Sequence, residues 1–160
     1  MQIFVLSGYR GKRQRDPFGP DQKDNEVPQI PLIAIIDDDG AVRTSTANLM
    51  RSAGYEAISF ASGEELLASA RLNQVNCVIT DVQMPGMSGL KLQDALLARR
   101  FTRPIIFITA YPEERDRCQA FAAGALAFFS KPFDGTEMLE CVSKAVNAQS
   151  DSRPDETRHP

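Results

Sequence analysis

The sequence predicts an α/β protein whose core is a parallel sheet covered on both faces by helices. Short apolar runs rich in β-branched residues alternate with segments whose apolar residues recur every three or four positions. These two periods are typical of buried strands and amphipathic helices. The alternation repeats five times, so consecutive strands are expected to run in the same direction. A chain of 160 residues is long enough for one such domain with a sizeable core.

The first two strand–helix units carry clear boundary signals. Leu32–Ile36 is predicted to be a buried strand, and the helix after it is predicted to end at Gly54. The residues predicted to form the inner face of that helix are Val42, Thr46, Leu49, Met50 and Ala53. Tyr55–Phe60 is the predicted second strand, and the capping box Ser62-Gly63-Glu64-Glu65 begins the next helix. The inward residues predicted for this second helix are Leu66, Leu67 and Ala70.

The third unit is the one around which the rest of the chain is arranged. Cys77-Val78-Ile79-Thr80 is predicted to be a buried strand, and Asp81 stands at its carboxyl end. Pro85 and Gly86 favour a turn after it, and Ser88 is placed to cap the next helix. The residues predicted to share one face of that helix are Leu90, Asp94 and Leu97. Asp81 is therefore expected on a rigid strand end beneath a fixed loop.

The last two units complete the sheet. Pro104–Thr109 is the predicted fourth strand, followed by a helix that begins at Pro112 and ends at Gly124. The apolar residues of this helix are Cys118, Phe121 and Ala122. Leu126–Phe129 is the predicted fifth strand, and Asp134 is placed to open the final helix. The inner face predicted for the final helix consists of Met138, Cys141, Val142 and Ala145.

Both ends of the chain differ in composition from the middle. Residues 1–29 are rich in glycine, proline and charge without periodicity, which predicts a flexible N-terminal extension. A basic cluster in this extension, beside Tyr9, consists of Arg10, Lys12, Arg13 and Arg15. A solvated tail is favoured over contact with nucleic acid or an acidic partner. Residues 149–160 are predicted to be a polar C-terminal tail, so the folded domain is expected over 30–148.

Composition excludes several classes of function. A formal net charge of −3 and a pI near 5.2 argue against a nucleic-acid-binding domain. No apolar run approaches the roughly 20 residues that span a bilayer, and the first residues do not resemble a signal peptide. The three cysteines, Cys77, Cys118 and Cys141, are far apart and odd in number, which favours small buried thiols in a reduced, cytoplasmic chain. His159 is the only histidine, so a histidine metal site or triad is not available.

Reactive side chains are expected to converge at the carboxyl edge of the sheet. Asp37-Asp38-Asp39 follows the first strand, Asp81 ends the third, Thr109 ends the fourth, and Lys131 comes just after the fifth. In a flavodoxin-like doubly wound sheet of order 2-1-3-4-5, the first and third strands are neighbours at the switch point. Three carboxylates crowded there repel one another unless a cation intervenes, and an all-oxygen site suits Mg²⁺. A carboxylate nucleophile, a divalent cation, a hydroxyl and a lysine are the groups that phosphoryl transfer onto aspartate requires.

The chain from about Leu32 to Ala148 resembles a bacterial response-regulator receiver domain. The five matching motifs, in order, are Ile35-Ile36-Asp37-Asp38-Asp39, Asp81-Val82-Gln83-Met84-Pro85-Gly86-Met87-Ser88-Gly89, Ile108-Thr109-Ala110, Ala123-Gly124-Ala125 and Lys131-Pro132-Phe133. In style, the fourth and fifth strand regions are closest to receivers of nitrogen-fixation and nodulation regulators. Such domains have the (βα)5 fold with strand order 2-1-3-4-5.

The resemblance implies a role for each matched position. Asp81 would be phosphorylated by a partner histidine kinase. The ligands implied for Mg²⁺ are Asp37, Asp38, Asp81 and the backbone carbonyl of Gln83. Thr109 would bind a phosphoryl oxygen, and Lys131, followed by a cis peptide bond to Pro132, would pair with the phosphoryl group. Phe128 would be the aromatic switch, although plain core packing explains that position equally well in the unphosphorylated state.

The resemblance also implies how the domain would signal. A downstream protein or a second copy would read the face formed by the fourth helix, the fifth strand and the fifth helix, without direct contact to nucleic acid or membrane. The domain would catalyse only its own phosphorylation and dephosphorylation. Members of this subfamily usually continue into a helix-turn-helix output domain, yet nothing foldable follows Ala148. Output is therefore expected to pass through another protein, or the chain is a truncation.

Three other readings share part of the pattern. A haloacid-dehalogenase-type phosphatase would use Asp37 within Asp37-Asp38-Asp39-Gly40, but it would need a further acidic pair after Lys131 and room for a cap domain. A non-catalytic receiver-like interaction module would usually lack one of the acidic, hydroxyl or lysine groups, and all are present. A flavin-binding protein of the same fold would not place three aspartates at its phosphate loop.

Overall fold

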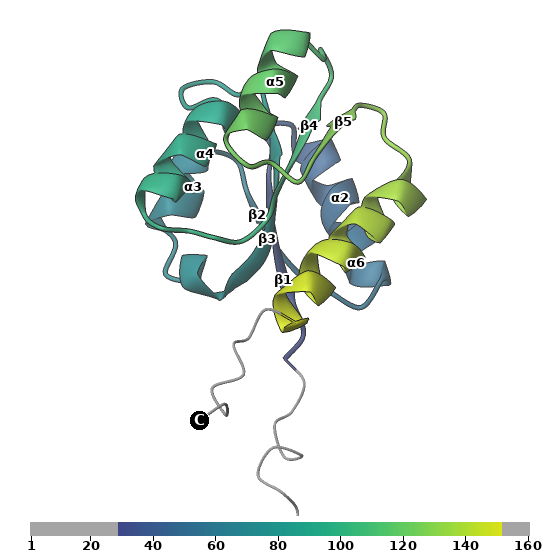
Figure 1. Ribbon diagram of the computed structural model, residues 1–160. Helices are drawn as coiled ribbons and strands as arrows, with labels where there is room; N and C mark the ends of the chain where they lie inside the picture. The colour runs from purple at the N-terminus through teal and green to yellow at the C-terminus, as the bar shows by residue number, and fades with distance from the viewer. Residues whose placement is uncertain (1–28, 152–160) are drawn as a thin grey trace, which may run out of the picture.

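Five parallel strands in the order β2-β1-β3-β4-β5 form one sheet in the computed structural model, which describes residues 29–151 (Figure 1). The strands are β1 (Leu32–Ile36), β2 (Glu56–Phe60), β3 (Val75–Asp81), β4 (Ile105–Thr109) and β5 (Ala127–Ser130). The predicted strand order and parallel direction are confirmed. The basic cluster of the N-terminal extension, His159 and most of the C-terminal tail lie outside the described residues.

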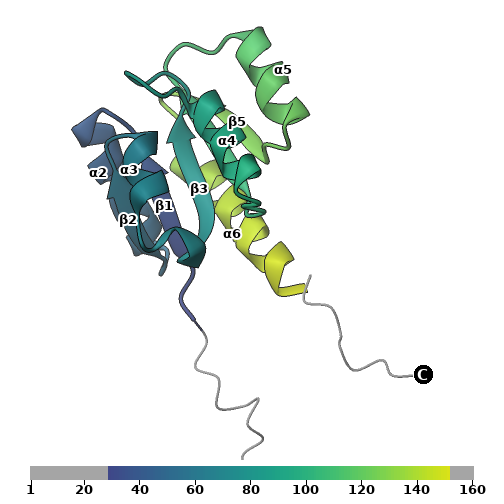
Figure 2. The ribbon, with the colours of Figure 1, turned by 90° about the vertical axis from the view of Figure 1, so that its left-hand side faces the viewer.

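Helices cover both faces of the sheet, as predicted. The helices are α2 (Gly40–Ser52), α3 (Gly63–Ala68), α4 (Gly89–Ala98), α5 (Glu114–Ala122) and α6 (Gly135–Asp151), with a short 3₁₀ turn η1 (Leu72–Gln74) before β3. Figures 1 and 2 show α2 and α6 on one face and α3, α4 and α5 on the other. Each face has its own apolar cluster, one containing Met50 and Met138 and the other containing Leu66 and Leu92. The central strands β1 and β4 are buried along their whole length, so the strand ends are held rigidly.

Local capping signals set where the helices begin. Ser62 accepts a hydrogen bond from the Glu65 backbone N–H at 3.2 Å, and the Glu65 side chain accepts from the Ala61 N–H at 2.9 Å. Ser88 caps α4 by accepting from the Lys91 N–H at 3.2 Å. These side chains satisfy backbone donors that have no partner in the first helical turn. The predicted caps at Ser62 and Ser88 are confirmed.

Several predicted inward residues lie at the surface instead. Ala53 and Ala70 are exposed, because α2 ends one residue before Ala53 and α3 ends two residues before Ala70. On α4 the buried side chains are Leu90, Leu92, Gln93 and Leu96, and the predicted stripe leaves Asp94 exposed and Leu97 46% exposed. A helix covers a sheet along one narrow line, and an apolar residue about 100° away from that line stays in solvent.

The helix α5 shows the largest departure from the prediction. It begins at Glu114 rather than Pro112, and its apolar residues Cys118, Phe121 and Ala122 are all exposed. Ala120 is the only residue of α5 that is buried. The expectation of three buried thiols is therefore wrong for Cys118, whereas Cys77 is buried and Cys141 is half-buried.

Candidate functional site

The carboxyl ends of β1 and β3 bring three aspartates together. Strand register aligns Ile36 with Thr80, so Asp37 and Asp81, one residue further along, stand side by side. One carboxylate oxygen from each of Asp37, Asp38 and Asp81 lies within 4.8 Å of the others. Asp37 is fully buried, Asp81 is 7% exposed and Asp38 is exposed. The structure therefore forms the acidic pocket that the sequence predicted.

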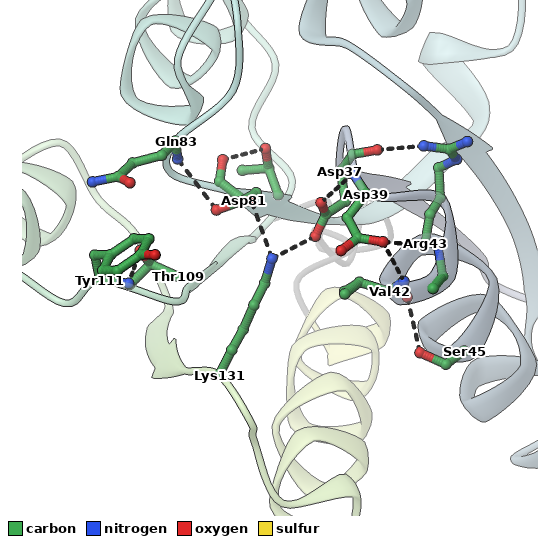
Figure 3. Close-up of polar contacts among 12 residues, drawn as sticks. Asp37, Asp39, Val42, Arg43, Ser45, Asp81, Gln83, Thr109, Tyr111 and Lys131 are labelled. Carbon is green, nitrogen blue, oxygen red and sulfur yellow. Dashed lines mark hydrogen bonds and ion pairs between the residues drawn. The ribbon is translucent and has the colours of Figure 1, made fainter.

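Lys131, which directly follows the edge strand β5, extends its side chain into this pocket. Its Nζ lies 2.8 Å from Asp37 Oδ2 and 3.0 Å from Asp81 Oδ2, so one ammonium bridges both carboxylates (Figure 3). Burial works against the charged ammonium, but the hydrogen bonds to the two aspartates outweigh it and raise the pKa of Lys131 above its ordinary value. Lys131 is therefore a fixed positive charge at physiological pH.

Burial also acts on the acceptor candidate itself. Desolvation raises the pKa of the Asp81 carboxyl above its ordinary value, and the hydrogen bond and charge of Lys131 only partly offset that rise. The neighbouring Asp37 carboxylate adds to the increase. The ionised form of Asp81 is thus held in an environment that stabilises it poorly in the absence of further cations.

The loop after β3 packs closely around Asp81. The Gln83 backbone N–H donates to Asp81 Oδ1 at 3.2 Å, and the Gly89 N–H donates to the Val82 carbonyl at 2.8 Å. A side chain at Gly89 would collide with the backbone carbonyl of Asp81, so only glycine allows α4 to begin this close to the strand end. This loop fixes the direction of the Asp81 carboxylate.

Thr109 borders the pocket from β4. It is 1% exposed, and its Oγ1 accepts a hydrogen bond from the Tyr111 N–H at 3.1 Å. The Lys131 N–H donates to the Thr109 carbonyl at 2.7 Å, which ties the strand end of β4 to the loop that carries the lysine. The Lys131–Pro132 peptide bond is cis, as predicted.

Phe128 lies on β5, beneath this end of the sheet. Its side chain is half-buried and packs against the apolar cluster that contains Leu66 and Leu92. The centroid of its ring lies 6.2 Å from that of Phe107. Packing of this kind satisfies an aromatic side chain without any switching role. The switch role therefore stays a prediction.

Sequence reasoning missed the contribution of two residues beside the pocket. Arg43 Nη1 donates to the Asp37 backbone carbonyl at 2.6 Å from the first turn of α2 (Figure 3). Asp39 caps the same helix by accepting from Ala41 and Val42, at 2.9 and 3.3 Å, and its N–H donates to Asp37 Oδ1 at 2.9 Å. An arginine early in a helix carries no sequence signal for such a role, whereas an aspartate just before a helix is a recognised cap.

The doubly wound sheet, with its acidic pocket, buried threonine and bridging lysine, has the fold and the groups of a phosphoacceptor signalling domain. The sequence profile of the response regulator receiver domain matches residues 33–143. This protein belongs to that family, and it is a receiver domain of two-component signalling.

Curated relatives place the domain within larger proteins. Nodulation protein W of Bradyrhizobium diazoefficiens is 37% identical over 115 residues, covering 72% of this chain and 51% of the relative. The transcriptional regulatory protein TdiR of Thauera aromatica is 35% identical, covering 71% and 50%. The chain thus spans about half the length of these relatives.

Solved structures support the same fold. The response regulator StyR is 36% identical with a TM-score of 0.72, covering 78% of this chain and 63% of that one. The structure of FixJ-N is 31% identical with a TM-score of 0.67, covering 74% and 95%.

Among residues 29–151, no helix combines the length and apolar character needed to cross a bilayer.

Proposed function

We propose that Asp81 accepts a phosphoryl group from a phosphohistidine of a partner kinase. The observation that carries this assignment is its position on the middle one of three strand ends, with Lys131 Nζ 3.0 Å away. In the transfer, a carboxylate oxygen of Asp81 attacks phosphorus, the P–N bond breaks, and the histidine nitrogen leaves with the electron pair of that bond. The product is an acyl phosphate on Asp81.

The same pocket suits Mg²⁺. The proposed ligands are oxygens of Asp37, Asp38 and Asp81, whose clustering within 4.8 Å fits a small, hard cation, together with the Gln83 backbone carbonyl. Bound there, the ion would neutralise charge on the phosphoryl oxygens. Lys131 would pair with one of those oxygens, and the Thr109 hydroxyl would donate a hydrogen bond to another.

Asp37 is the rival acceptor, as in a haloacid-dehalogenase-type phosphatase. Its side chain is fully buried and is engaged by Lys131 and by the Asp39 N–H, which leaves an incoming phosphoryl group less access to it than to Asp81. Asp81 keeps some exposure. The structure therefore favours Asp81 over Asp37.

The acceptor is tested by Asp81→Asn with acetyl phosphate as the donor. The variant is expected to lose all hydroxylamine-labile phosphate, because an amide cannot form the acyl phosphate. Asp94→Asn, an exposed aspartate on α4, is the matched control and should label normally. Label retained in Asp81→Asn would move the acceptor elsewhere, and the absence of label in the wild type would favour a non-catalytic interaction module.

The metal assignment is tested by Asp38→Ala. Mg²⁺ affinity measured by calorimetry is expected to fall at least tenfold, because the proposed site has few charged ligands. Asp94→Ala removes a carboxylate outside the pocket and should leave the affinity unchanged. An unchanged affinity in Asp38→Ala would contradict the ligand set.

Signalling is proposed to pass through the face formed by α5, β5 and α6. Near this face, Phe121 is 40% and Leu126 43% exposed. Movement of Thr109 toward the phosphoryl group would open space into which the Phe128 ring turns, burying area that favours the active state by roughly 1–3 kcal/mol. A downstream protein or a second copy would read the changed face.

The switch is tested by sedimentation with and without a beryllofluoride mimic of the phosphoryl group. Wild type should change its association, whereas Thr109→Ala and Phe128→Ala should respond weakly. If both variants respond like the wild type, the coupling between Thr109 and Phe128 is wrong, whatever becomes of the phosphorylation site.

The remaining assignments concern the setting of the domain. We place the receiver domain at residues 30–148, in the cytoplasm, with a histidine kinase as its phosphodonor and no direct nucleic-acid or membrane partner. Its only catalysis would be its own phosphorylation and dephosphorylation. Support comes from the family membership and from the complete set of acidic, hydroxyl and lysine groups.

A further inference from the structure

A hollow lies at the opposite edge of the sheet from the acidic pocket. Its volume is about 360 Å³, and it is bounded by the segment around η1 and by the loop that joins α4 to β4. Because the helices run antiparallel to the strands, this edge collects the carboxyl ends of the helices (Figure 2). The proposed phosphoryl chemistry uses no residue of this hollow.

The wall of this hollow is strongly cationic. Arg99, Arg100 and Arg103 all line it, and none of its lining residues is acidic. The partners of the first and third arginines are neutral: Arg99 Nη1 donates to the Leu67 carbonyl at 2.7 Å, and Arg103 Nη1 donates to Gln149 Oε1 at 2.6 Å. Within the described residues 29–151, these three positive charges stand within five residues without an ion-pair partner, although the chain as a whole is acidic.

Arg100 is held in a backbone conformation that costs stability. Its φ is +60°, and it is the only non-glycine residue among those described with a positive φ. The corresponding positions after α2 and α5 are Gly54 and Gly124, with φ of +91° and +95°. An L-residue in this region is less stable than glycine, and such outliers persist at sites that bind ligands.

The side chain of Arg100 gains nothing from the fold in return. Within residues 29–151 its guanidinium has no hydrogen-bond or ion-pair partner, and the residue is exposed. A favourable interaction with the helix carboxyl terminus needs a positive charge, but Arg99 already supplies one at the end of α4. Fold stability therefore does not explain an arginine at position 100.

We propose that this hollow binds a small phosphorylated molecule. Guanidinium groups match the geometry of phosphate oxygens, and three of them suit a group that carries two or more negative charges. The volume lies within the range of small-molecule sites. Leu72 and Phe101 provide an apolar wall for an organic portion, and Ser69 and Asn73 provide polar groups beside it.

The test is a calorimetric titration of the full chain with inorganic pyrophosphate in the presence of EDTA. Wild type is expected to show saturable binding, and Arg100→Gly is expected to bind roughly tenfold more weakly, because one charge-assisted contact is lost. The same variant should melt about 2–4 °C higher, because glycine relieves the positive φ. Weaker binding in a more stable protein cannot be ascribed to unfolding.

Three controls separate this site from other cationic groups. Arg115→Gly, on α5, removes one exposed arginine outside this hollow and should bind pyrophosphate like the wild type. A variant with glutamine at all four basic positions of the N-terminal cluster should also bind normally. Citrate, a carboxylate of similar charge, should bind more weakly than pyrophosphate.

Several results would overturn the proposal. Pyrophosphate binding in Arg100→Gly equal to that of the wild type would remove the hollow as the site. Citrate binding as tightly as pyrophosphate would remove the phosphate assignment. Wild type without saturable binding below about 1 mM would show that the three arginines form no site of biological strength.

Discussion

Replacing Lys131 with methionine gives the most direct measure of how the acidic pocket is held together. The substitution keeps most of the side-chain volume and removes the ammonium that lies 2.8 Å from Asp37 and 3.0 Å from Asp81. The Asp37 side chain is fully buried, and those of Asp81 and Lys131 are 10% and 15% exposed, so solvent screens these charges weakly. Without a metal ion, two neighbouring carboxylates would then face each other unpaired.

The expected loss follows from this geometry. Removing one partner of a buried ion pair costs about 3–5 kcal/mol. Some exposure at Asp81 and protonation of one carboxyl reduce the cost, so we expect the free energy of unfolding to fall by about 3 kcal/mol at pH 7.5 in EDTA. For a domain of this size that corresponds to a melting temperature about 10 °C lower.

The assay is thermal unfolding followed by circular dichroism, with and without Mg²⁺. Magnesium should recover much of the loss in Lys131→Met, because the ion would neutralise the same two carboxylates and binds only the folded state. Lys91→Met, at an exposed position of α4, is the matched control and should melt like the wild type. Equal melting temperatures for Lys131→Met and wild type in EDTA would refute the view that Lys131 holds two otherwise repelling charges together.

Three further outcomes are expected. The folded-state pKa of the Asp81 carboxyl is raised, so ionising this carboxyl destabilises the fold increasingly as the pH rises from the unfolded pKa through the folded pKa. Calorimetric scans should therefore show that Asp81→Asn melts higher than wild type at pH 7.5 in EDTA and loses that advantage near pH 3. Gly89→Ala should lower the free energy of unfolding by about 2–4 kcal/mol in urea unfolding, because the added Cβ collides with the Asp81 carbonyl. The control Gly40→Ala has space for a Cβ and should show a much smaller change. Arg43→Ala should lower the Mg²⁺ affinity measured by calorimetry roughly tenfold, because the 2.6 Å hydrogen bond to the Asp37 carbonyl is lost. An unchanged affinity would show that the Asp39 cap alone positions this loop.

The number of strands and the composition of the pocket could be predicted because each rests on a local pattern, whereas the strand order was taken from the flavodoxin-like doubly wound arrangement. Five apolar runs fix the number of strands, and a residue directly after a buried strand must lie at the carboxyl edge of the sheet, as Asp37 and Asp81 do. Lys131 contacts Asp37 although the two residues lie 94 positions apart in the sequence, and no local pattern predicts a contact over that distance. The resemblance to receivers implied that Lys131 pairs with the phosphoryl group, but it did not predict the contact with Asp37.

The errors arose where one apolar residue could point either inward or outward. Periodicity identified the apolar residues of α5, but the sheet contacts that helix at the small residue Ala120, and the larger Phe121 beside it faces solvent with Arg117 over its ring. The stripe on α4 failed in the same way, since Leu97 lies outside the line of contact. Tertiary packing decides such cases, and sequence periodicity leaves them open.

The shallow anchoring of α5 has a consequence for how information could leave the domain. Its single buried side chain, Ala120, hides little apolar area, and one cross-helix bond, from Gln93 Nε2 to the Ala120 carbonyl at 3.0 Å, adds modest stability. By contrast, α4 and α6 bury three or more side chains each. Displacing α5 therefore costs a few kcal/mol at most, which is comparable to what one added phosphoryl group can supply through its hydrogen bonds. Among the helices of the domain, α5 is thus the one expected to move at least cost, and it forms part of the face proposed to contact a partner.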